Sequence, residues 1–219
     1  MIGSGVLLEC LADRRITSVL SIVRAPGRVA HSKLTERVHA DFLDYGALRD
    51  DLVGVDACFF CAGVSSLGMS EDAYRRITYD VTLAAANALL AASPQVCFCY
   101  VSGAGTDDTA KGSVMWARVK GETEHALLAL PLGAAYMFRP GYIQPLNGAR
   151  SKTPLYRAIY TALGWLYPIA HAVAPQYVTT TVDLGRAMIQ VARAGDAKRV
   201  LEVADINRLS SSYANEVRA

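Results

Sequence analysis

The sequence predicts an α/β fold in which one domain, residues 1–219, holds a doubly wound and mostly parallel sheet. Short apolar runs typical of buried strands alternate with longer segments whose apolar residues recur at helical spacing, as in βαβ units. The clearest strand covers residues 96–101, because this run is mostly apolar, β-branched or aromatic and stops at the Ser-Gly-Ala-Gly turn of residues 102–105. With 219 residues, of which 52% are hydrophobic, the chain can bury a sizeable core.

The other elements follow from the same two patterns. Apolar runs bounded by Gly, Pro or polar residues predict further strands at residues 17–23, 37–40, 56–61, 134–138 and 198–203. Helical spacing predicts helices at residues 6–12, 45–52, 69–92 and 116–130, and from about 179 onward. The serine-rich segment after Leu209 is predicted to be frayed.

The composition gives no indication of a nucleic-acid partner. The net charge is only +2, and the basic residues are scattered rather than interleaved with aromatic ones. Five cysteines, an odd number in an ordinary globular composition, indicate a reducing compartment. The start of the sequence also lacks the basic region of a secretory signal. We therefore expect a cytoplasmic protein.

No metal site is predicted. Cys58 and Cys61 have the Cys-x-x-Cys spacing of one ligand pair of a metal site. The pair lies inside a strand-like run, where an offset of three residues puts two side chains on opposite faces. Cys97 and Cys99 would share a face, but no second ligand pair follows at zinc spacing. Buried structural cysteine is the preferred interpretation for all five.

Ser102 and Lys120 are the predicted catalytic residues. In a doubly wound sheet, ligands bind just beyond the carboxyl ends of the strands, and Ser102 directly follows the strand at residues 96–101. Its hydroxyl can hydrogen-bond a substrate carbonyl, and Lys120 on the next helix can reach back toward the same crevice. We therefore expect the hydroxyl and the ammonium group to converge on one bound ligand.

This stretch resembles the active-site segment of the short-chain dehydrogenase/reductase superfamily, in which a Ser after the fifth strand precedes a Tyr-x-x-x-Lys helix. More narrowly, the motifs at residues 100–105, 120–124 and 139–141 resemble the atypical branch around the Tat-interacting oxidoreductase and the NmrA-like proteins. These motifs read Tyr-Val-Ser-Gly-Ala-Gly, Lys-Gly-Glu-Thr-Glu and Arg-Pro-Gly. The resemblance covers nearly the whole chain, and it implies a Rossmann-like domain that binds NAD or NADP.

The sequence departs from the family pattern at Trp116, four residues before Lys120, where the family has Tyr. In the family, that Tyr is the general acid/base, because the neighbouring Lys and the cofactor charge lower its pKa from about 10. An indole N–H only donates a hydrogen bond and does not titrate in this range. The family's usual proton transfer therefore lacks its donor in this chain.

The N-terminal unit resembles a family member that lacks its first strand. Relatives carry a Gly-x-x-Gly-x-x-Gly turn ahead of the first helix, and Gly3 aligns with the third glycine of that turn. The strand and the first two glycines are absent from the sequence. Two explanations stay open: the true start lies upstream of Met1, which we favour, or the chain natively lacks its central strand and binds nucleotide more weakly. In the second case, buried ladder groups of two strands would go unpaired, at about 1–3 kcal/mol each.

Arg24, which directly follows the strand at residues 17–23, favours NADP as the cofactor. An acidic residue at this strand end would hydrogen-bond a ribose 2′-hydroxyl, whereas an Arg accommodates a 2′-phosphate. Arg28 is a second candidate for the same contact. The alternatives, a solvated turn arginine and NAD as the cofactor, stay open.

The remaining cofactor residues are implied by the resemblance. Asp41 and Phe42 take the positions that contact the adenine, although Asp41 could also simply start a turn. Ala62 and Gly63 follow the strand at residues 56–61, and Gly63 would let the backbone pass close to the ribose and phosphates. Lys120 would hold the nicotinamide ribose.

Arg139 and Pro140 resemble the start of a loop that closes over the nicotinamide. Pro fixes φ, so the loop can hold its shape beside a ligand, and a purely structural role for Arg139 is an equal alternative. Residues 145–180 are predicted to form a helical lid on the substrate side, within an apolar stretch interrupted by Pro168 and Pro175. Those prolines argue against a membrane span of about 20 residues. A partner or membrane-surface face is the alternative interpretation.

Two functions fit these observations. The first is an NADP-dependent oxidoreductase of the atypical short-chain type, in which Ser102 polarises an unidentified small-molecule substrate. The family also contains epimerases and dehydratases. The second is a non-catalytic NAD(P)-binding regulator or scaffold, which Trp116 favours. A structural remnant that binds no nucleotide stays open as well, if the chain natively lacks its first strand. Relatives use the helix pair at residues 69–92 for dimerisation, so the resemblance is also compatible with a homodimer.

Overall fold

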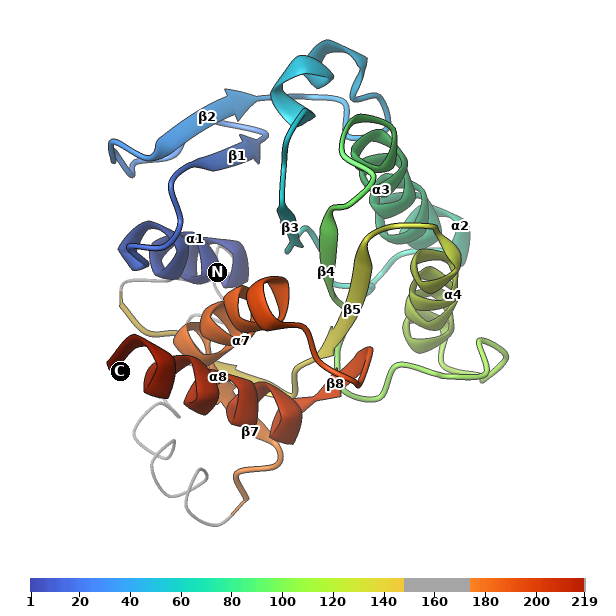
Figure 1. Cartoon of the computed structure of the whole chain (residues 1–219). Helices are drawn as coiled ribbons and strands as arrows, with labels where there is room; N and C mark the ends of the chain where they lie inside the picture. Colours follow the sequence, from blue (N-terminus) through green and yellow to red (C-terminus); the bar gives the residue numbers. More distant parts are fainter. Residues whose placement is uncertain (148–173, 219) are drawn as a thin grey trace.

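The computed structural model describes residues 1–147 and 174–218 (Figure 1). Its strands are β1 (Val19–Val23), β2 (Leu34–Val38), β3 (Ala57–Phe60), β4 (Cys97–Val101), β5 (Ala134–Arg139), β6 (Tyr142–Gln144), β7 (Val178–Thr180) and β8 (Val200–Glu202). Its helices are α1 (Ile2–Ala12), α2 (Glu71–Arg75), α3 (Val81–Ala92), α4 (Met115–Ala129), α7 (Thr181–Ala194) and α8 (Val203–Arg218).

The central sheet has four parallel strands in the order β3-β4-β5-β8, with helices on both faces (Figure 1). One face packs against α1, α7 and α8, and the other packs against α3 and α4. Side chains of β4 alternate between these two cores: Cys97 and Cys99 enter the first, and Phe98 and Tyr100 the second. The predicted doubly wound α/β arrangement is therefore confirmed.

The sheet is not continuous with the first two strands. β1 pairs only with β2, in parallel, and forms a separate two-stranded sheet. β6 and β7 form a second small parallel pair. The break between β1 and β3 lies where the sequence predicted that a central strand is absent.

Several predicted elements differ from the structure. Residues 45–52 form two short 3₁₀ turns, Gly46–Leu48 and Asp50–Leu52, rather than a helix. A π-helical turn, Arg76–Asp80, separates α2 from α3 inside the long predicted helix. β2 begins three residues earlier than predicted, at Leu34, and ends at Val38.

The prediction of a frayed serine-rich tail is wrong. That segment belongs to α8, and its side chains Ile206, Leu209 and Tyr213 are buried against the sheet and α7. The serine residues of this stretch hid the helical spacing of these three side chains.

The predicted lid at residues 145–180 falls mainly on residues 148–173, which lie outside the described residues, so the structure does not test it. At its end, residues 178–180 form β7. None of the helices within residues 1–147 and 174–218 combines the length and apolar character that crossing a membrane requires.

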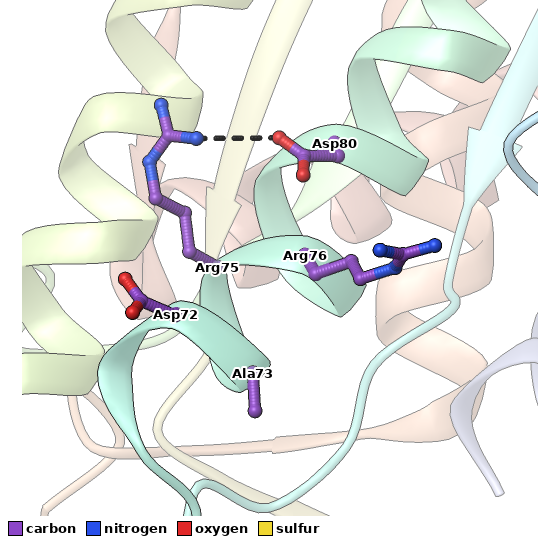
Figure 2. A pocket seen from close by; sticks show the side chains of 5 residues that line it. All are labelled: Asp72, Ala73, Arg75, Arg76 and Asp80. Atoms are coloured by element: carbon purple, nitrogen blue, oxygen red, sulfur yellow. Dashed lines mark hydrogen bonds and ion pairs between the residues drawn. The ribbon is translucent and has the colours of Figure 1, made fainter.

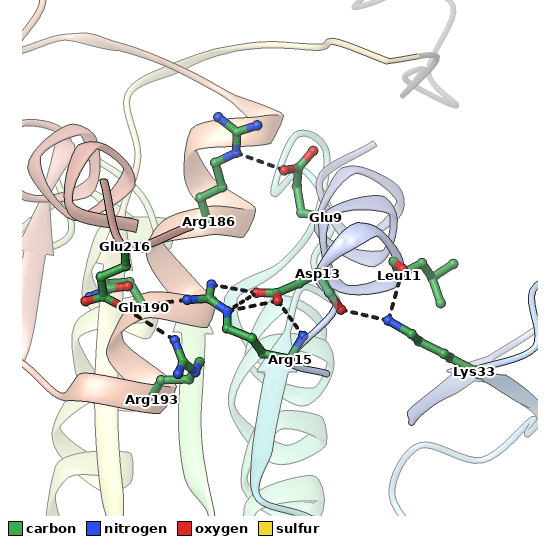
Figure 3. Close-up of polar contacts among 9 residues, drawn as sticks. All are labelled: Glu9, Leu11, Asp13, Arg15, Lys33, Arg186, Gln190, Arg193 and Glu216. Atoms are coloured by element: carbon green, nitrogen blue, oxygen red, sulfur yellow. Dashed lines mark hydrogen bonds and ion pairs between the residues drawn. The ribbon is translucent and has the colours of Figure 1, made fainter. Parts of the chain in front are cut away.

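Glycines allow α1 to approach α7 closely. A Cβ at Gly5 would lie 2.5 Å from the Cβ of Thr181, and a Cβ at Gly185 would lie 2.9 Å from Cγ of Glu9. The Arg186 Nε then donates to the Glu9 carboxylate at 3.0 Å (Figure 3). A larger side chain at either glycine would push the two helices apart.

The C-terminal end of α1 is also tied down. The Lys33 Nζ donates to the backbone carbonyls of Leu11 and Asp13, at 3.4 and 2.7 Å, which suits the negative end of a helix dipole (Figure 3). Asp13 binds Arg15 through both carboxylate oxygens. Although burial raises the pKa of Asp13, its hydrogen bonds from Arg15 hold that pKa at about 2. The position of α1 is therefore fixed by α7 and by Lys33, which directly precedes β2.

Candidate functional site

The carboxyl ends of the parallel strands form the edge at which the predicted site lies. In the central sheet, Phe60 pairs with Tyr100, and Val101 pairs with Phe138. The residues that follow these strands therefore emerge side by side. They include Ala62 and Gly63 after β3, Ser102 after β4 and Pro140 after β5.

Ser102 is held by the backbone of β5. Its backbone N–H donates to the Phe138 carbonyl at 2.8 Å, and its Oγ donates to the same carbonyl at 3.1 Å. The residue is 5% exposed. Since the hydroxyl proton is engaged, Ser102 can offer lone pairs to a ligand in this conformation, but no proton.

Lys120 reaches the same point of the edge from α4, as predicted. Its Nζ donates to the backbone carbonyl of Ser102, and a Cβ at Gly103 would lie 4.0 Å from that nitrogen. Burial lowers the pKa of Lys120 to about 8, while the Glu124 carboxylate acts in the opposite direction. The structure thus brings Ser102 and Lys120 together, with the ammonium bound to the carbonyl rather than to the hydroxyl.

We expect the Lys120 amine to titrate near pH 8 rather than near the ordinary lysine value of 10.5. Because the unfolded chain binds more protons between those values, Lys120 makes the free energy of unfolding rise with pH across that window. Pulse labelling of amines at pH 6–11, read by peptide mass spectrometry, gives the midpoint for Lys120. A midpoint near 10.5, or an unfolding free energy whose pH dependence is unchanged in Lys120→Met, would contradict this assignment.

Trp116 lies against the glycine loop at this edge. A Cβ at Gly105 would lie 3.6 Å from Cη2 of the indole. Gly105 has φ +84°, a left-handed conformation that glycine adopts without strain. The indole therefore covers part of the loop between β4 and α4, one helical turn before Lys120.

The rest of that loop is locked onto α4 through Asp107. Its backbone N–H donates to the Ala117 carbonyl at 3.1 Å, and a Cβ at Gly121 would lie only 2.0 Å from the Asp107 carbonyl oxygen. The carboxylate accepts from the Thr109 hydroxyl at 2.7 Å and from the Gly112 N–H at 2.5 Å. These hydrogen bonds lower the pKa of Asp107 to about 2. Sequence reasoning missed Asp107 and its role in shaping the loop.

Arg139, which the resemblance places beside the cofactor, is engaged in ion pairs within the protein. It is 5% exposed, and its guanidinium binds both oxygens of the buried Glu124 carboxylate. The same group pairs with Asp108 at 2.5 Å and with Glu202 at 3.4 Å. Its donors are therefore satisfied within the protein, and these contacts support the structural alternative for Arg139.

Pro140 is buried as well, and its carbonyl accepts from the Ala104 N–H at 2.9 Å. It therefore fixes the glycine loop to the end of β5 rather than presenting its ring to solvent. Glu124, the partner of Arg139, was not singled out from the sequence. Its position four residues after Lys120, on the same helix face, is the signal that could have found it.

Gly3 and Gly63, the glycines predicted to lie near the phosphates, are both found at the end of β3. A Cβ at Gly3 would lie 3.3 Å from the Cβ of Cys61, so the first turn of α1 sits beside the end of β3. The first hydrogen bond of α1 runs from the Gly5 N–H to the Met1 carbonyl, at 3.1 Å. The N–H groups of Ile2, Gly3 and Ser4 therefore have no acceptor within the helix. Gly63 is exposed, and a Cβ there would meet no atom within 4 Å.

The adenine-side residues lie on the separate sheet. Arg24 is exposed after β1. The Asp41 carboxylate accepts from the Leu43 N–H at 2.9 Å, which is the turn that the alternative interpretation predicted. Phe42 is half-buried, and its ring packs near His39 at 5.8 Å between centroids. These residues share the carboxyl end of β1 and β2, but the structure joins none of them to the central sheet by a strand pair.

The described residues outside this edge show no metal-binding cluster and no disulfide. All five cysteines are free, and no group of three or more His, Cys, Asp or Glu within the described ranges could hold a metal ion. An open surface depression is lined by Asp72, Ala73, Arg75, Arg76 and Asp80 (Figure 2). There the Arg75 guanidinium pairs with Asp80 at 3.3 Å and lies over the Tyr79 ring. Its positive charge is therefore already paired within the protein.

Comparison with solved structures identifies the fold. The chain is similar to UDP-glucose 4-epimerase of Thermotoga maritima, with 14% identity, a TM-score of 0.66 and coverage of 97% of this chain and 79% of that one. A short-chain dehydrogenase/reductase superfamily protein of Agrobacterium tumefaciens with bound NAD has 12% identity and a TM-score of 0.61, over 95% of this chain and 78% of that one. This chain shares the Rossmann-like fold of these proteins. WbmF of Bordetella bronchiseptica, in complex with NAD⁺, also shares that fold, with 14% identity and a TM-score of 0.61 over 98% of this chain and 74% of that one.

Sequence comparison gives a weaker match. Protein fmp52, mitochondrial, of Emericella nidulans is 28% identical over 150 residues. The match covers 65% of this chain and 63% of that protein. No protein-family model matches the chain.

The carboxyl edge of the sheet offers groups of the kind that could hold the ribose and phosphates of a nucleotide. Lys120 supplies an ammonium, the first turn of α1 supplies N–H donors near Gly3, and Gly63 leaves open space beside them. No titratable hydroxyl stands at position 116, and the Ser102 proton is engaged by Phe138. The arrangement therefore supports binding more directly than proton transfer.

Proposed function

We propose that this chain binds NAD(P) along the carboxyl edge of its parallel sheet, with NADP preferred over NAD. The observation that carries the proposal is the meeting of Lys120 and Ser102 at the end of β4, within a short-chain dehydrogenase/reductase fold. Two of the solved proteins with this fold are described with bound NAD or NAD⁺. The preference for NADP rests on Arg24, whose exposed guanidinium suits a 2′-phosphate.

Each part of the edge has a separate task in this proposal. Lys120 donates to the ribose hydroxyls next to the nicotinamide, using the ammonium N–H groups that do not bind the Ser102 carbonyl. The N-terminal turn of α1, at Gly3, faces the phosphates. When bound, the nucleotide supplies a hydride donor or acceptor, and the chain's own residues orient it.

Titration of NADPH and NADH into the protein, followed by nucleotide fluorescence, tests the binding. Loss of a hydrogen bond from a charged donor costs about 1.5–3 kcal/mol, so Lys120→Met is expected to weaken NADPH binding by roughly 10- to 100-fold. Lys111→Met removes an exposed ammonium from the neighbouring loop and should leave the affinity unchanged. Arg24→Ser should weaken NADPH binding and spare NADH. Absence of binding to either nucleotide would refute the proposal.

A second function, a non-catalytic NAD(P)-binding regulator or scaffold, is favoured by two observations at the end of the site where the nicotinamide ring would lie. Trp116 lies over the Gly105 loop, and the Ser102 hydroxyl donates to the Phe138 carbonyl. Turnover of NADPH with a panel of aldehydes, ketones and quinones separates the two. Nucleotide binding without turnover supports the regulator, and turnover supports an oxidoreductase.

Location and assembly belong to the same proposal. We keep the cytoplasm as the proposed location, although the matched protein of Emericella nidulans is named as mitochondrial. A homodimer through the α2–α3 region is the proposed assembly. Cell fractionation and light scattering test the two statements separately.

A further inference from the structure

Glu124 lies on the same face of α4 as Lys120, four residues further along the helix. Long side chains of a helix lean toward its N-terminus, so the Glu124 side chain extends back over the turn that carries Lys120. The Cβ atoms of residues at this spacing are about 5–6 Å apart, which is close enough for an ion pair between Lys and Glu. The helix alone would therefore allow Glu124 to bind the Lys120 ammonium.

The structure shows a different partner for each of these two groups. The Arg139 guanidinium binds both oxygens of Glu124, with Nε donating to Oε1 at 3.0 Å and Nη2 donating to Oε2. The Lys120 Nζ donates instead to the Ser102 carbonyl, just beyond the carboxyl end of β4. Glu124 and Arg139 are only 2% and 5% exposed, so water competes little for their charges. The carboxylate one turn from Lys120 is therefore bound to another cation.

The position of Arg139 does not depend on Lys120. Arg139 ends β5, which pairs with β4 on one side and with β8 on the other. In that ladder Arg139 lies opposite Glu202, and its Nη1 pairs with the Glu202 carboxylate at 3.4 Å. Its Nη2 also pairs with Asp108 at 2.5 Å. The sheet therefore fixes Arg139, and Arg139 in turn determines where the Glu124 carboxylate lies.

The other charged groups around α4 are bound elsewhere. The Asp107 carboxylate accepts from Thr109 and from the Gly112 N–H. On another face of α4, the α2 residues Glu71 and Arg75 pair with Arg118 and Glu122. Burial raises the pKa of Tyr100, the β4 phenol nearest Glu124, so that phenol stays neutral.

Glu124 nevertheless lies close enough to act on Lys120. Burial lowers the pKa of Lys120 to about 8, and the Glu124 carboxylate opposes this shift. A direct contact between the two groups would oppose it more strongly, because the attraction between opposite charges grows as their separation falls. The charge of Lys120 therefore reports where the carboxylate is.

We propose that Arg139 is a positioning residue for Lys120: it holds the Glu124 carboxylate at the end of β5 and so leaves the Lys120 ammonium at Ser102, where a nucleotide ribose can bind it. The ligand in this inference rests on the proposed function, and Arg139 acts through Glu124 rather than by touching the nucleotide. Without Arg139, the buried carboxylate would lack a counter-charge, which is costly. Glu124 would then take the ammonium of Lys120 and draw it along α4, away from Ser102.

Titration of the Lys120 amine in Arg139→Met tests the proposal without nucleotide, by pulse labelling and peptide mass spectrometry. An opposite charge within about 4–6 Å shifts a pKa by about 1–3 units, so we expect the Lys120 midpoint to rise from about 8 by at least about one unit. Adding Glu124→Gln removes the carboxylate and should return the midpoint to about 8. Arg118→Met is the matched control, because Arg118 binds both oxygens of Glu71 on another face of α4 and its loss should leave the midpoint unchanged.

A second measurement follows NADPH affinity in the same variants. Arg139→Met should weaken binding by roughly 10- to 100-fold, as Lys120→Met does, since both remove the ammonium from the ribose. The two losses should not add in the double variant of Arg139 and Lys120, and Glu124→Gln should restore the affinity of Arg139→Met. If none of the proteins binds NADPH, the proposed function fails, and the amine titration still decides this inference.

Two outcomes of the titration would overturn the proposal. One is an unchanged Lys120 midpoint in Arg139→Met, which is what a purely structural Arg139 predicts. The other is a raised midpoint that Glu124→Gln does not reverse. If circular dichroism shows that Arg139→Met does not fold, Arg139→Lys takes its place, because one ammonium cannot bind both carboxylate oxygens in the way that a guanidinium does. The same rise and the same reversal by Glu124→Gln are expected there, and their absence would refute the role of Arg139.

Discussion

Replacing Arg139 with Met is expected to lower the free energy of unfolding by about 3–5 kcal/mol, because it leaves the buried Glu124 carboxylate without its counter-charge. Glu124 is 2% exposed, and both of its oxygens bind the Arg139 guanidinium. Urea denaturation followed by circular dichroism measures the loss. Met approximates the length of the aliphatic part of Arg, so packing changes contribute less than the lost charge pair.

Two further variants separate the buried pair from the exposed contacts of Arg139. Asp108 is 77% exposed, so Asp108→Asn should cost less than about 1 kcal/mol although it removes an ion pair. The double variant Arg139→Met with Glu124→Leu should recover most of the loss, since the uncompensated charge is gone. If the double variant is as unstable as Arg139→Met alone, the cost lies in packing and not in the buried charge.

The parts of the site that the sequence predicted are local in the chain. Ser102 and Lys120 belong to one strand–loop–helix unit, so the end of the apolar run and the following helical pattern were enough to bring them together. The break between β1 and β3 was also predictable, because the sequence shows no strand ahead of the first helix. The meeting of Ser102 with Lys120 and the break between β1 and β3 were both predictable, because elements that are consecutive in the sequence usually lie next to each other in the fold.

The contacts that sequence reasoning missed join elements that are separate in the chain. Arg139 at the end of β5 binds Glu124 on α4 and Glu202 at the end of β8, and no periodicity relates these positions. The Ser102 hydroxyl turns to a backbone carbonyl of β5, and a backbone acceptor leaves no sequence signal. α8 was missed for another reason, because its serine-rich surface masked the apolar residues of one face.

Trp116→Tyr is expected to raise NADPH-dependent reduction of small aldehydes or ketones by roughly 10²- to 10⁴-fold over the parent chain, the usual contribution of a positioned general acid. Position 116 lies one helical turn before Lys120 on α4, on the same face. Below about pH 8 the Lys120 amine is protonated, and its charge would lower the pKa of a neighbouring phenol from about 10. Steady-state oxidation of NADPH, followed by absorbance across pH 6–10, gives the rate and its pH profile.

The controls for this gain isolate the phenolic hydroxyl. Trp116→Phe removes the indole from the Gly105 loop without adding a proton donor, so a rate equal to that of Trp116→Tyr would show that opening the loop is sufficient. Adding Lys120→Met to Trp116→Tyr should abolish the gain and shift the pH profile upward. If Trp116→Tyr binds NADPH but stays inactive, the engaged Ser102 hydroxyl identifies the second obstacle. Its O–H still donates to the Phe138 carbonyl, so the substrate oxygen receives no hydrogen bond from that side. That result would favour the non-catalytic function, since one substitution at position 116 would then be insufficient to restore the reacting end of the site.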